Sequence, residues 1–353
     1  MDRLATEQQI RFTTVASGAR IAWARSGRGP PLLRAAHWLT HVERDSDSPI
    51  WRPWLQRLGR SVQCVSYDER GCGLSGSDDT PLGLEAAVEE LVAVADAAGL
   101  AQTAVLGFSG SAAPAIAFAA RYPQRVTHLV LLGAYACGML HRTPSAEALA
   151  YHEAVVRLVE LGWGKPESAV QQFFTATLIP DATAVQQAAL NEQQRLSCDG
   201  RRAAAILRAR VGLDVRPLLA QVRCPTLVLH AAGDATVSVE AGREVAAGIP
   251  GARFETLATR NHIPLAGEPA FERFCDAVAG HVREHATAGA PTLTPRERDL
   301  IELVARGLDN LQIAAHTGLS EKTVRNAMSA LYARLGVEGR PQAVVRARDL
   351  GFG

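Results

Sequence analysis

The stretch 103–122 constrains the fold of this 353-residue chain more than any other. Residues 103–106 are apolar or β-branched and predict a buried strand. Gly107-Phe108-Ser109-Gly110-Ser111 follows as a turn of mostly small residues, and the alanine-rich segment from Ala112 predicts a helix. A strand that turns sharply into a helix leaves little room beside the backbone, which explains the small residues around Ser109. The sequence therefore predicts a strand–turn–helix unit with the Ser109 hydroxyl at its turn.

Strand-like and helix-like segments alternate on both sides of this unit, after a hairpin of two short strands at the start of the chain. Such alternation predicts an α/β fold with a mainly parallel sheet that helices cover on both faces. Ligands bind these sheets at the carboxyl ends of the strands, where Ser109 and the loop beginning His37-Trp38 both fall. We expect strands at 12–15, 21–24, 31–36, 62–67, 103–106, 126–132, 225–229 and 254–257, and helices at 51–58, 82–98, 112–122, 239–247 and 268–285.

The turn at Ser109 resembles the G-x-S-x-G nucleophile elbow of the α/β hydrolases, with Ser111 in place of the last glycine. Asp234 follows the strand at 225–229, and His262 follows the final strand. The order Ser109, Asp234, His262 is the Ser…Asp…His order of that family, so the resemblance implies a catalytic triad. In a triad, the imidazole takes the serine proton, and the carboxylate holds the imidazole in the required tautomer.

The resemblance also implies an oxyanion hole made by the backbone N–H groups of Trp38 and Gly110. In the family, the loop that carries the first of these donors usually has the sequence His-Gly. Here His37 replaces the glycine and places a side chain where the backbone normally approaches the substrate. This departure and Ser111 count against efficient turnover, whereas the complete triad favours it.

Asp68-Glu69-Arg70-Gly71-Cys72-Gly73-Leu74-Ser75 resembles the D-x-R-G-x-G-x-S loop of the same family. An aspartate and an arginine this close together in a glycine-rich turn most often brace the loop. We therefore expect Asp68 and Arg70 to form a structural ion pair and to take no part in catalysis.

The alternation stops at about 141–220. No strand pattern appears there, and the sequence predicts helices at 145–160, 166–174, 182–196 and 201–211. We expect a helical cap inserted over the site, which would enclose a small, largely apolar ligand. For each aromatic or aliphatic cap residue, packing between the cap and the sheet is an equally open interpretation. The candidate pocket residues are His37, Trp163, Phe173, Phe174, Leu178 and Ile179.

The composition changes again near residue 285. His-Ala-Thr-Ala-Gly-Ala-Pro at 285–291 is typical of a linker. Thr294-Pro295-Arg296-Glu297 is a capping box with proline at the first helical position. Helical segments at 310–316 and 320–335, separated by Gly318, have the pattern of a helix-turn-helix. We expect domains at 1–285 and 292–353, a linker at 286–291, and an all-α C-terminal domain of four helices.

Residues 293–351 closely resemble the LuxR-type DNA-binding domain over its full length. The matching pieces are Leu-Thr-Pro-Arg-Glu-Arg at 293–298, Asn-Leu-Gln-Ile-Ala at 310–314, Leu-Ser-Glu-Lys-Thr-Val-Arg-Asn at 319–326 and Leu-Gly-Val at 335–337. The resemblance implies that the helix after Ser320 enters the major groove of double-stranded DNA. Ala327, where the family commonly has histidine, predicts an altered sequence preference. The residues expected to contact bases and phosphates are Asn310, Lys322, Thr323, Arg325, Asn326 and Ser329.

Charge limits how this domain binds DNA. Residues 290–353 contain nine Lys and Arg and seven Asp and Glu, a net charge of +2, and the whole chain has a net charge of +1. A net charge of +2 is low for a domain that binds DNA as a monomer. The resemblance implies a homodimer formed through the last helix, which would double the charge and the contacts.

The remaining composition predicts a cytoplasmic protein, and the LuxR-type resemblance implies a bacterial one that is nucleoid-associated when bound to DNA. The N-terminus lacks an apolar signal segment, and no apolar run has the length of a membrane span. The six cysteines are scattered without a C-x-x-C pair, so we expect reduced, mostly buried thiols and neither metal nor cofactor.

Two functions follow from the two halves. In the first, favoured interpretation the chain is a transcriptional regulator whose hydrolase-like domain senses a small apolar ester or lactone, with residual hydrolysis. In the second it is a serine esterase or lactonase whose DNA-binding domain only localises or regulates it. The DNA-binding domain has no purpose in a plain metabolic enzyme, which favours the regulator.

Overall fold

The computed structural model of the chain describes residues 8–142, 145–165, 169–284, 293–335, 337, 339–349 and 352. The chain divides into two compact units, Met1–Ala279 and Gly280–Gly353. The linker expected at 286–291 lies outside the described residues, so the domain boundaries next to it stay predictions.

An eight-stranded sheet forms the centre of the N-terminal unit, in the order β1-β2-β4-β3-β5-β6-β7-β8. β2 pairs antiparallel with both β1 and β4, and all the other neighbours pair in parallel. The predicted mainly parallel α/β fold is therefore confirmed. The strands are β1 (Gln9–Thr14), β2 (Arg20–Gly27), β3 (Pro31–Arg34), β4 (Gln63–Tyr67), β5 (Thr103–Phe108), β6 (Val126–Leu132), β7 (Thr226–Ala231) and β8 (Arg253–Leu257).

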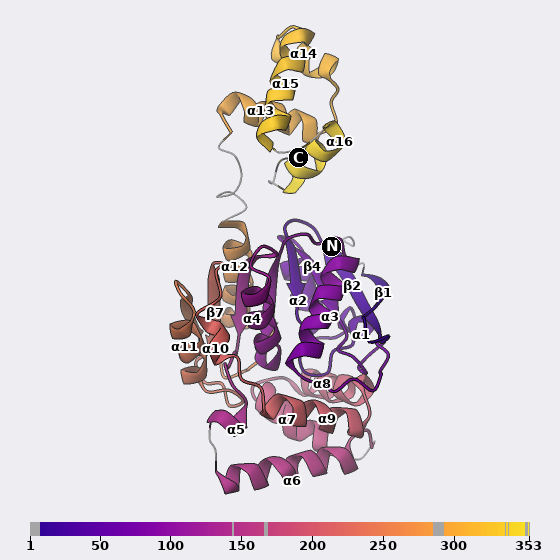
Figure 1. Cartoon of the computed structure of the whole chain (residues 1–353), viewed down its shortest axis with the longest axis vertical. Helices are drawn as coiled ribbons and strands as arrows, with labels where there is room; N and C mark the ends of the chain where they lie inside the picture. Colours follow the sequence, from indigo (N-terminus) through magenta and orange to yellow (C-terminus); the bar gives the residue numbers. More distant parts are fainter. Residues whose placement is uncertain are drawn as a thin grey trace. The chain divides into compact units, whose positions relative to one another are not determined.

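Helices cover both faces of this sheet (Figure 1). On one face, α3 (Leu84–Ala97) packs beside α4 (Ala112–Arg121), which lies against β5 and β6, and α11 (Val239–Gly248) lies against β7 and β8. On the other face, α2 (Trp51–Leu58) packs against β2 and β4. The Trp54 ring of α2 lies 4.4 Å from the Phe274 ring of α12 (Pro269–Glu284). The sheet is thus buried from both sides, as its nearly continuous apolar strands predict.

The boundaries of the elements differ from the predicted ones where they matter for the site. β5 continues through Phe108, so the strand runs directly into the turn at Ser109. Three helices of four residues each were not predicted, because they are too short to show a helical period. They are α1 (Val42–Asp45), α5 (Met139–Arg142) and α10 (Arg216–Leu219).

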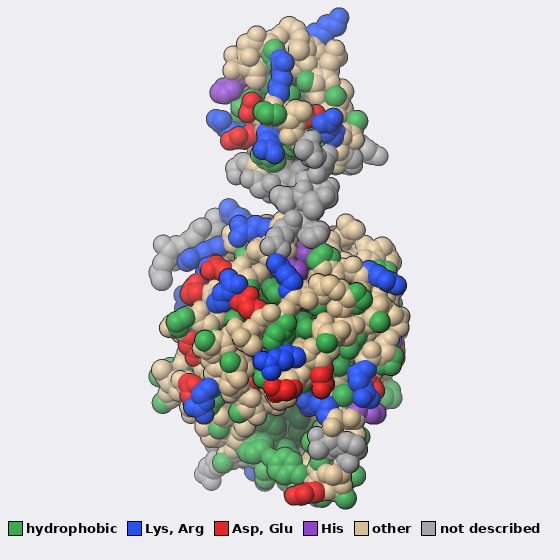
Figure 2. Space-filling model, turned by 90° about the vertical axis from the view of Figure 1, so that its left-hand side faces the viewer, with side chains coloured by type: hydrophobic (Ala, Val, Ile, Leu, Met, Phe, Trp, Pro, Cys, Tyr) green, Lys and Arg blue, Asp and Glu red, His purple; other side chains and the backbone are tan. Residues whose placement is uncertain are grey.

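Four longer helices form the cap between β6 and β7, and each of the helices expected there is present. They are α6 (Ala146–Gly162), α7 (Val170–Leu178), α8 (Ala184–Ser197) and α9 (Gly200–Val211), and Figure 1 shows them together at one end of the unit. The outer helix α6 leaves Tyr151, Leu158 and Leu161 between 50% and 59% exposed. Hydrophobic side chains accordingly gather at this end of the unit in Figure 2.

The C-terminal unit contains α13 (Pro295–Ala305), α14 (Asn310–Thr317), α15 (Glu321–Leu335) and α16 (Arg340–Asp349) around a small apolar core. The predicted capping box is confirmed, because Thr294 and Glu297 cap each other's backbone N–H at the start of α13. Gly318 ends α14 in the left-handed conformation, with a φ of 69°. Among the residues that the structure describes in both units, no helix is long and apolar enough to cross a membrane.

Candidate functional site

Ser109 stands at the turn between β5 and α4 in a conformation that serine rarely adopts. Its φ is 54°, in the left-handed region, where the side chain is close to the backbone. Leu39, in the loop after β3, has a φ of 52°. Both strained residues lie at carboxyl ends of neighbouring strands, β5 and β3. Strain of this kind persists where the surrounding structure imposes it, commonly at a functional site.

Ser111 fills the space under this turn. Its Oγ accepts a hydrogen bond from the Phe108 backbone N–H at 2.9 Å and lies 3.0 Å from the Phe108 carbonyl oxygen. The same Oγ lies 3.3 Å from the carbonyl oxygen of Ala35, on the adjacent chain segment. Ser111 is 1% exposed, so its hydroxyl ties the turn together from inside. A serine can therefore replace the usual glycine here without displacing the turn.

Asp234 and His262 are in direct contact, although 27 residues separate them in the chain. His262 Nδ1 lies 2.5 Å from Asp234 Oδ2, and both side chains are fully buried. Asp234 Oδ1 accepts the backbone N–H groups of Thr236 at 2.8 Å and Val237 at 3.0 Å. Burial by itself raises the pKa of Asp234, but the bonds from His262 and the backbone outweigh it, and the net pKa is lowered. Asp234 is thus an ionised carboxylate that orients an imidazole.

The other ring nitrogen of His262, Nε2, is buried and has no hydrogen-bond partner among the described residues. The structure therefore shows no bond between His262 and Ser109. Two contacts hold the ring in place. It lies 4.9 Å from the Phe108 ring, one residue before Ser109. Gly133 packs against its edge, because a Cβ at Gly133 would lie 2.5 Å from His262 Cε1.

His230, on β7, is a residue of this site that the sequence reasoning missed. Its Nε2 lies 2.9 Å from the Val237 carbonyl oxygen and 3.6 Å from Asp234 Oδ2. Asp234 is therefore flanked by two imidazoles, and burial lowers the pKa of His230, which favours its neutral form. The only sequence signal was its position at the end of a strand, four residues before Asp234.

Trp38 is held between the cap and the sheet. Its Nε1 donates to Gln194 Oε1 at 3.0 Å, and its ring lies 5.3 Å from Phe174 and 5.9 Å from Trp163. In the part of the chain that the structure describes, the Trp38 backbone N–H has no hydrogen-bond partner. Gly110 lies in the first turn of the elbow helix, where N–H groups have no partner within the helix. Both N–H groups are thus free for an external acceptor.

His37 turns away from this opening. Its ring lies 4.5 Å from the Trp51 ring and 5.6 Å from the Phe108 ring, and the residue is 2% exposed. Burial lowers the pKa of His37 well below its usual value, so the ring is neutral. His37 therefore fills the space under the strand end.

A small cavity of about 30 Å³ lies beside the elbow, but the candidate pocket residues do not line it. Trp163 and Phe174 pack against Trp38, and Phe173 is 40% exposed to solvent. The prediction of a wall built from these aromatic residues, together with His37, Leu178 and Ile179, does not fit this cavity. Their rings and aliphatic groups are used for packing, which was the alternative interpretation. The cavity is lined instead by Ala36, Tyr67, Glu69, Leu82, Gly83, Leu84, Ala87, Glu90, Gly110, Ser111, Pro114, Ile206, Ala209, Arg210 and Leu213.

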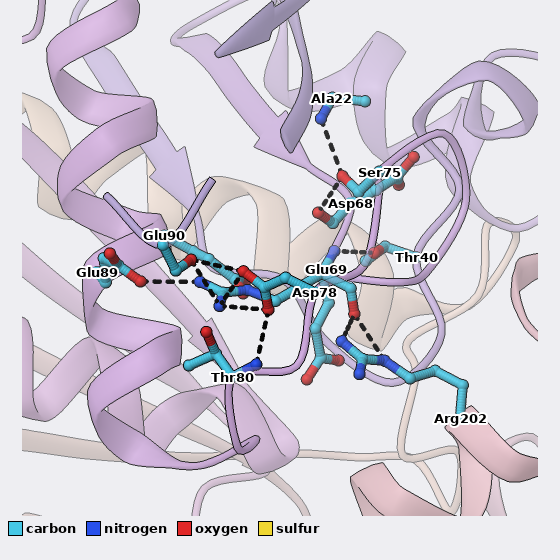
Figure 3. Close-up of polar contacts among 12 residues, drawn as sticks. Ala22, Thr40, Asp68, Glu69, Ser75, Asp78, Thr80, Glu89, Glu90 and Arg202 are labelled. Atoms are coloured by element: carbon cyan, nitrogen blue, oxygen red, sulfur yellow. Dashed lines mark hydrogen bonds and ion pairs between the residues drawn. The ribbon is translucent and has the colours of Figure 1, made fainter. Parts of the chain in front are cut away.

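Asp68 and Arg70 brace their loop, but the predicted ion pair between them is wrong. The carboxylate of Asp68 accepts the backbone N–H groups of Val42 at 2.8 Å and Leu74 at 2.9 Å. Arg70 has different partners, because carboxylates from the loop at 78 and from α3 surround its guanidinium. Figure 3 shows the three carboxylates that surround it, and its partners are Asp78 at 3.0 Å, Glu89 at 2.8 Å and Glu90 at 3.2 Å.

The C-terminal unit presents one face of α15 to solvent. Val324, Met328 and Leu331 are buried against the other helices. Four predicted contact residues, Lys322, Arg325, Asn326 and Ser329, are exposed at helical spacing on the opposite side. Thr323 is also exposed, and its backbone N–H donates at 3.1 Å to Ser320 Oγ, which caps the start of the helix. Asn310 differs from these, because its Oδ1 accepts a hydrogen bond from Arg340 Nη1 at 2.9 Å and so joins α14 to α16.

Among the described residues, no group of three or more His, Cys, Asp or Glu side chains is placed to hold a metal ion. Five of the six cysteines are buried, and Cys198 is half-buried.

Comparison with known proteins supports the two units separately. Residues 291–347 match the family of bacterial regulatory proteins of the luxR family, and residues 44–155 match the alpha/beta hydrolase fold. The spore germination protein GerE of Bacillus subtilis is 41% identical over 70 residues, which cover 20% of this chain and 95% of GerE. The chain belongs to the LuxR family of bacterial regulatory proteins.

Other relatives of this LuxR-family protein match one unit each. The transcriptional activator DevR/DosR of Mycobacterium tuberculosis is 52% identical over 58 residues, which are 16% of this chain and about a quarter (27%) of that activator. RutD of Azorhizobium caulinodans, described as a carbamate hydrolase, is 27% identical over 231 residues, 64% of this chain and 82% of RutD.

Solved structures show the fold of the N-terminal unit. An esterase from Exiguobacterium antarcticum aligns with a TM-score of 0.66 at 17% identity, covering 78% of this chain and all of the esterase. The enol-lactonase from Burkholderia xenovorans aligns with a TM-score of 0.61 at 19% identity, covering 77% and 99%. The N-terminal unit of the LuxR-family protein therefore has an α/β-hydrolase fold, and the DNA-binding domain follows it in the sequence.

For this LuxR-family protein, Asn326→Ala is expected to weaken binding to its own operator duplex by about 1–3 kcal/mol, because an exposed asparagine on the recognition helix suits an adenine edge. Lys322→Ala should instead weaken binding to operator and unrelated duplexes alike and reduce the salt slope by about one. Fluorescence anisotropy with labelled duplexes measures both. Arg298→Ala, an exposed arginine on α13, is the control. An Asn326→Ala protein with unchanged discrimination between duplexes would contradict base recognition by α15.

Proposed function

We propose that this chain is a transcriptional regulator whose hydrolase-fold unit senses a small, largely apolar ester or lactone and retains the capacity to hydrolyse it. One observation carries the proposal. A buried Asp234–His262 pair with an open Nε2 contacts Phe108, the residue before a strained serine, in the same chain as an exposed recognition helix. In this function, Ser109 is the nucleophile, His262 the general base and Asp234 the orienting acid, with the Trp38 and Gly110 N–H groups as oxyanion donors.

Contacts between the cap and the sheet support a sensing role. Trp38 bonds to Gln194 of α8, Glu69 to Arg210 of α9 at 3.0 Å, and Asp45 to Gln193 of α8 at 3.2 Å. Each of these polar bonds joins a residue of the core to a cap helix. A ligand in the cavity lined by both parts would change their relative stability, and such a change in one element can be transmitted to a dimer interface.

A homodimer is part of the proposal, as is a cytoplasmic location. Val345, on the last helix, is 61% exposed. Pairing of two such helices would cover it and would place two recognition helices on one DNA site.

The test is a coupling measurement on Ser109→Ala protein, which binds an ester without consuming it. We expect the affinity for the chain's own promoter DNA to change at least about threefold when short-chain lactones or p-nitrophenyl acetate are added at saturating concentration. Anisotropy titrations with and without the ester measure this coupling. If an ester binds, as shown by calorimetry, and the DNA affinity stays the same, the sensor role is wrong. Hydrolysis by the wild type with no coupling would then favour the alternative, an esterase or lactonase with an appended DNA-binding domain.

A further inference from the structure

The cavity beside the elbow is mostly apolar, but three charged side chains also line it. Its apolar wall comes from α3 and the segment before it, from α4, and from α9 and the segment after it, with Leu82, Leu84, Pro114, Ile206 and Leu213 among the lining residues. The charged lining residues are Glu69, Glu90 and Arg210, and Gly110 of the elbow also lines the cavity. A ligand that widened this cavity would have an apolar body and would place a polar group against the Arg210 guanidinium.

Arg210 reaches this position from the cap. It is the penultimate residue of α9, and its side chain reaches the turn that contains Ser109 and Gly110. A Cβ built on Gly110 would lie 3.1 Å from Arg210 Cδ and 3.2 Å from Arg210 Nε. The close approach of Arg210 therefore depends on the glycine that follows Ser109. No other described cationic side chain lines this cavity.

Two contacts fix the guanidinium and leave part of it free. Arg210 Nη2 donates to Glu69 Oε2 at 3.0 Å, and the guanidinium carbon lies 5.6 Å from the centre of the Trp38 ring. Among the described residues, Arg210 Nε and Nη1 have no hydrogen-bond partner. The Arg210 and Glu69 side chains are 16% and 15% exposed, so a ligand that replaced Glu69 would meet a largely desolvated cation.

We propose that Arg210 binds a free carboxylate of the ligand, so that the substrate class is a half-ester or lactone of a small dicarboxylic acid. This inference rests on the function proposed above and names its ligand. A planar guanidinium matches a carboxylate with two parallel N–H bonds, and a lysine in its place would not. Glu69 occupies the carboxylate position in the structure described here. When the ligand enters, its carboxylate takes the place of Glu69 and the ester group lies toward Ser109.

Glu69 is suited to being displaced. Burial raises the pKa of Glu69, although the neighbouring Arg210 and Arg202 guanidinium groups act against the rise. A carboxyl group with a raised pKa loses less free energy than an ordinary carboxylate when its cationic partner leaves, because it can bind a proton. Displacement would also break an ion pair between the cap and a core loop, which gives the ligand a direct effect on the cap.

The experiment compares charged and neutral esters of the same acids. Monoethyl and diethyl esters of succinic, glutaric and adipic acid are titrated into the full-length Ser109→Ala protein in a calorimeter. We expect at least one monoethyl ester to bind at least about tenfold tighter than its diethyl ester. Adding Arg210→Gln should abolish this preference, whereas adding Glu69→Gln should increase it, because Arg210 then has no competing carboxylate.

Arg208→Gln is the matched control, since Arg208 lies on the same helix and pairs with Glu160 at 3.2 Å on the surface. It should leave both affinities unchanged. Equal affinities for monoethyl and diethyl esters, unaltered by Arg210→Gln and Glu69→Gln, overturn the carboxylate inference and leave the sensor proposal in place. If no ester of either kind binds, the proposed function fails together with the inference. The opposite signs expected for the Glu69 and Arg210 variants separate a recognition effect from a loss of folding.

Discussion

Ser109→Ala is expected to lower the rate of p-nitrophenyl acetate hydrolysis by at least about 10³-fold, with DNA binding retained. The reason is the geometry at the turn. Ser109 is held at a φ of 54° at the end of β5, and the ring of the preceding Phe108 lies 4.9 Å from the buried His262 imidazole. His262 Nε2 has no partner among the described residues, and in the proposed chemistry it takes the proton of the Ser109 hydroxyl. Removal of the nucleophile leaves only the oxyanion donors, which cannot form an acyl-enzyme.

The measurement is release of p-nitrophenolate by purified protein at several substrate concentrations, so that kcat and KM separate. Ser77→Ala is the control, because Ser77 is an exposed serine in the loop before α3. His262→Ala should lose activity to a similar degree, since triad members act as a unit. Wild-type activity that survives Ser109→Ala would mean that the hydrolysis comes from another group, and the elbow would then be a binding turn without catalysis.

Local patterns predicted the framework of this site well. The strand into Ser109, the loop after β3 and the positions of Asp234 and His262 all follow from one rule, that parallel strands bring their carboxyl ends to one edge. Asp234 follows β7 and His262 follows β8, so the two residues can come into contact because these strands are neighbours in the sheet. Capping boxes and Gly318 likewise predicted the helices of the C-terminal unit, because caps depend on residues three positions apart.

Contacts between distant segments were less predictable. The aromatic cap residues suggested a pocket wall, yet Trp163 and Phe174 pack against Trp38, more than a hundred residues earlier. Arg210 was not singled out at all, since an arginine near the end of a helix most often interacts with the helix dipole or with solvent. Only the packing of α9 over the elbow shows where its side chain lies. His230 was missed for the same reason, because its role depends on the fold of the loop after β7.

The error over Asp68 and Arg70 has the same origin. Two opposite charges two residues apart suggested a pair, but backbone N–H groups occupy the Asp68 carboxylate and other carboxylates surround Arg70. The true partners of Arg70 are at 78, 89 and 90, on a loop and a helix whose approach the sequence does not reveal. Arg202 of the cap approaches the same loop and donates a hydrogen bond to the Arg70 carbonyl oxygen (Figure 3).

Arg70→Met is expected to lower the free energy of unfolding of the N-terminal unit by about 3–5 kcal/mol. The Arg70 side chain is 0% exposed and faces Asp78, Glu89 and Glu90, and it also donates to Ser17 Oγ at 3.0 Å. The loss of Arg70 affects Glu90 most among its three partners, because the Glu90 side chain is only 3% exposed. Without the guanidinium, this carboxyl group must either stay as an unpaired buried charge or bind a proton. Both states cost free energy that the wild type does not lose.

Urea unfolding followed by circular dichroism measures this effect, with Arg121→Met as the matched control. Arg121 pairs with Glu85 at 2.7 Å, but the two side chains are 35% and 78% exposed, so its loss should cost less than about 1 kcal/mol. Adding Glu90→Gln to Arg70→Met should restore at least about 1 kcal/mol, because an amide at this buried position cannot carry an unpaired charge. If the double variant is no more stable than Arg70→Met, packing of the long side chain, and not charge balance, is what holds this loop under the site.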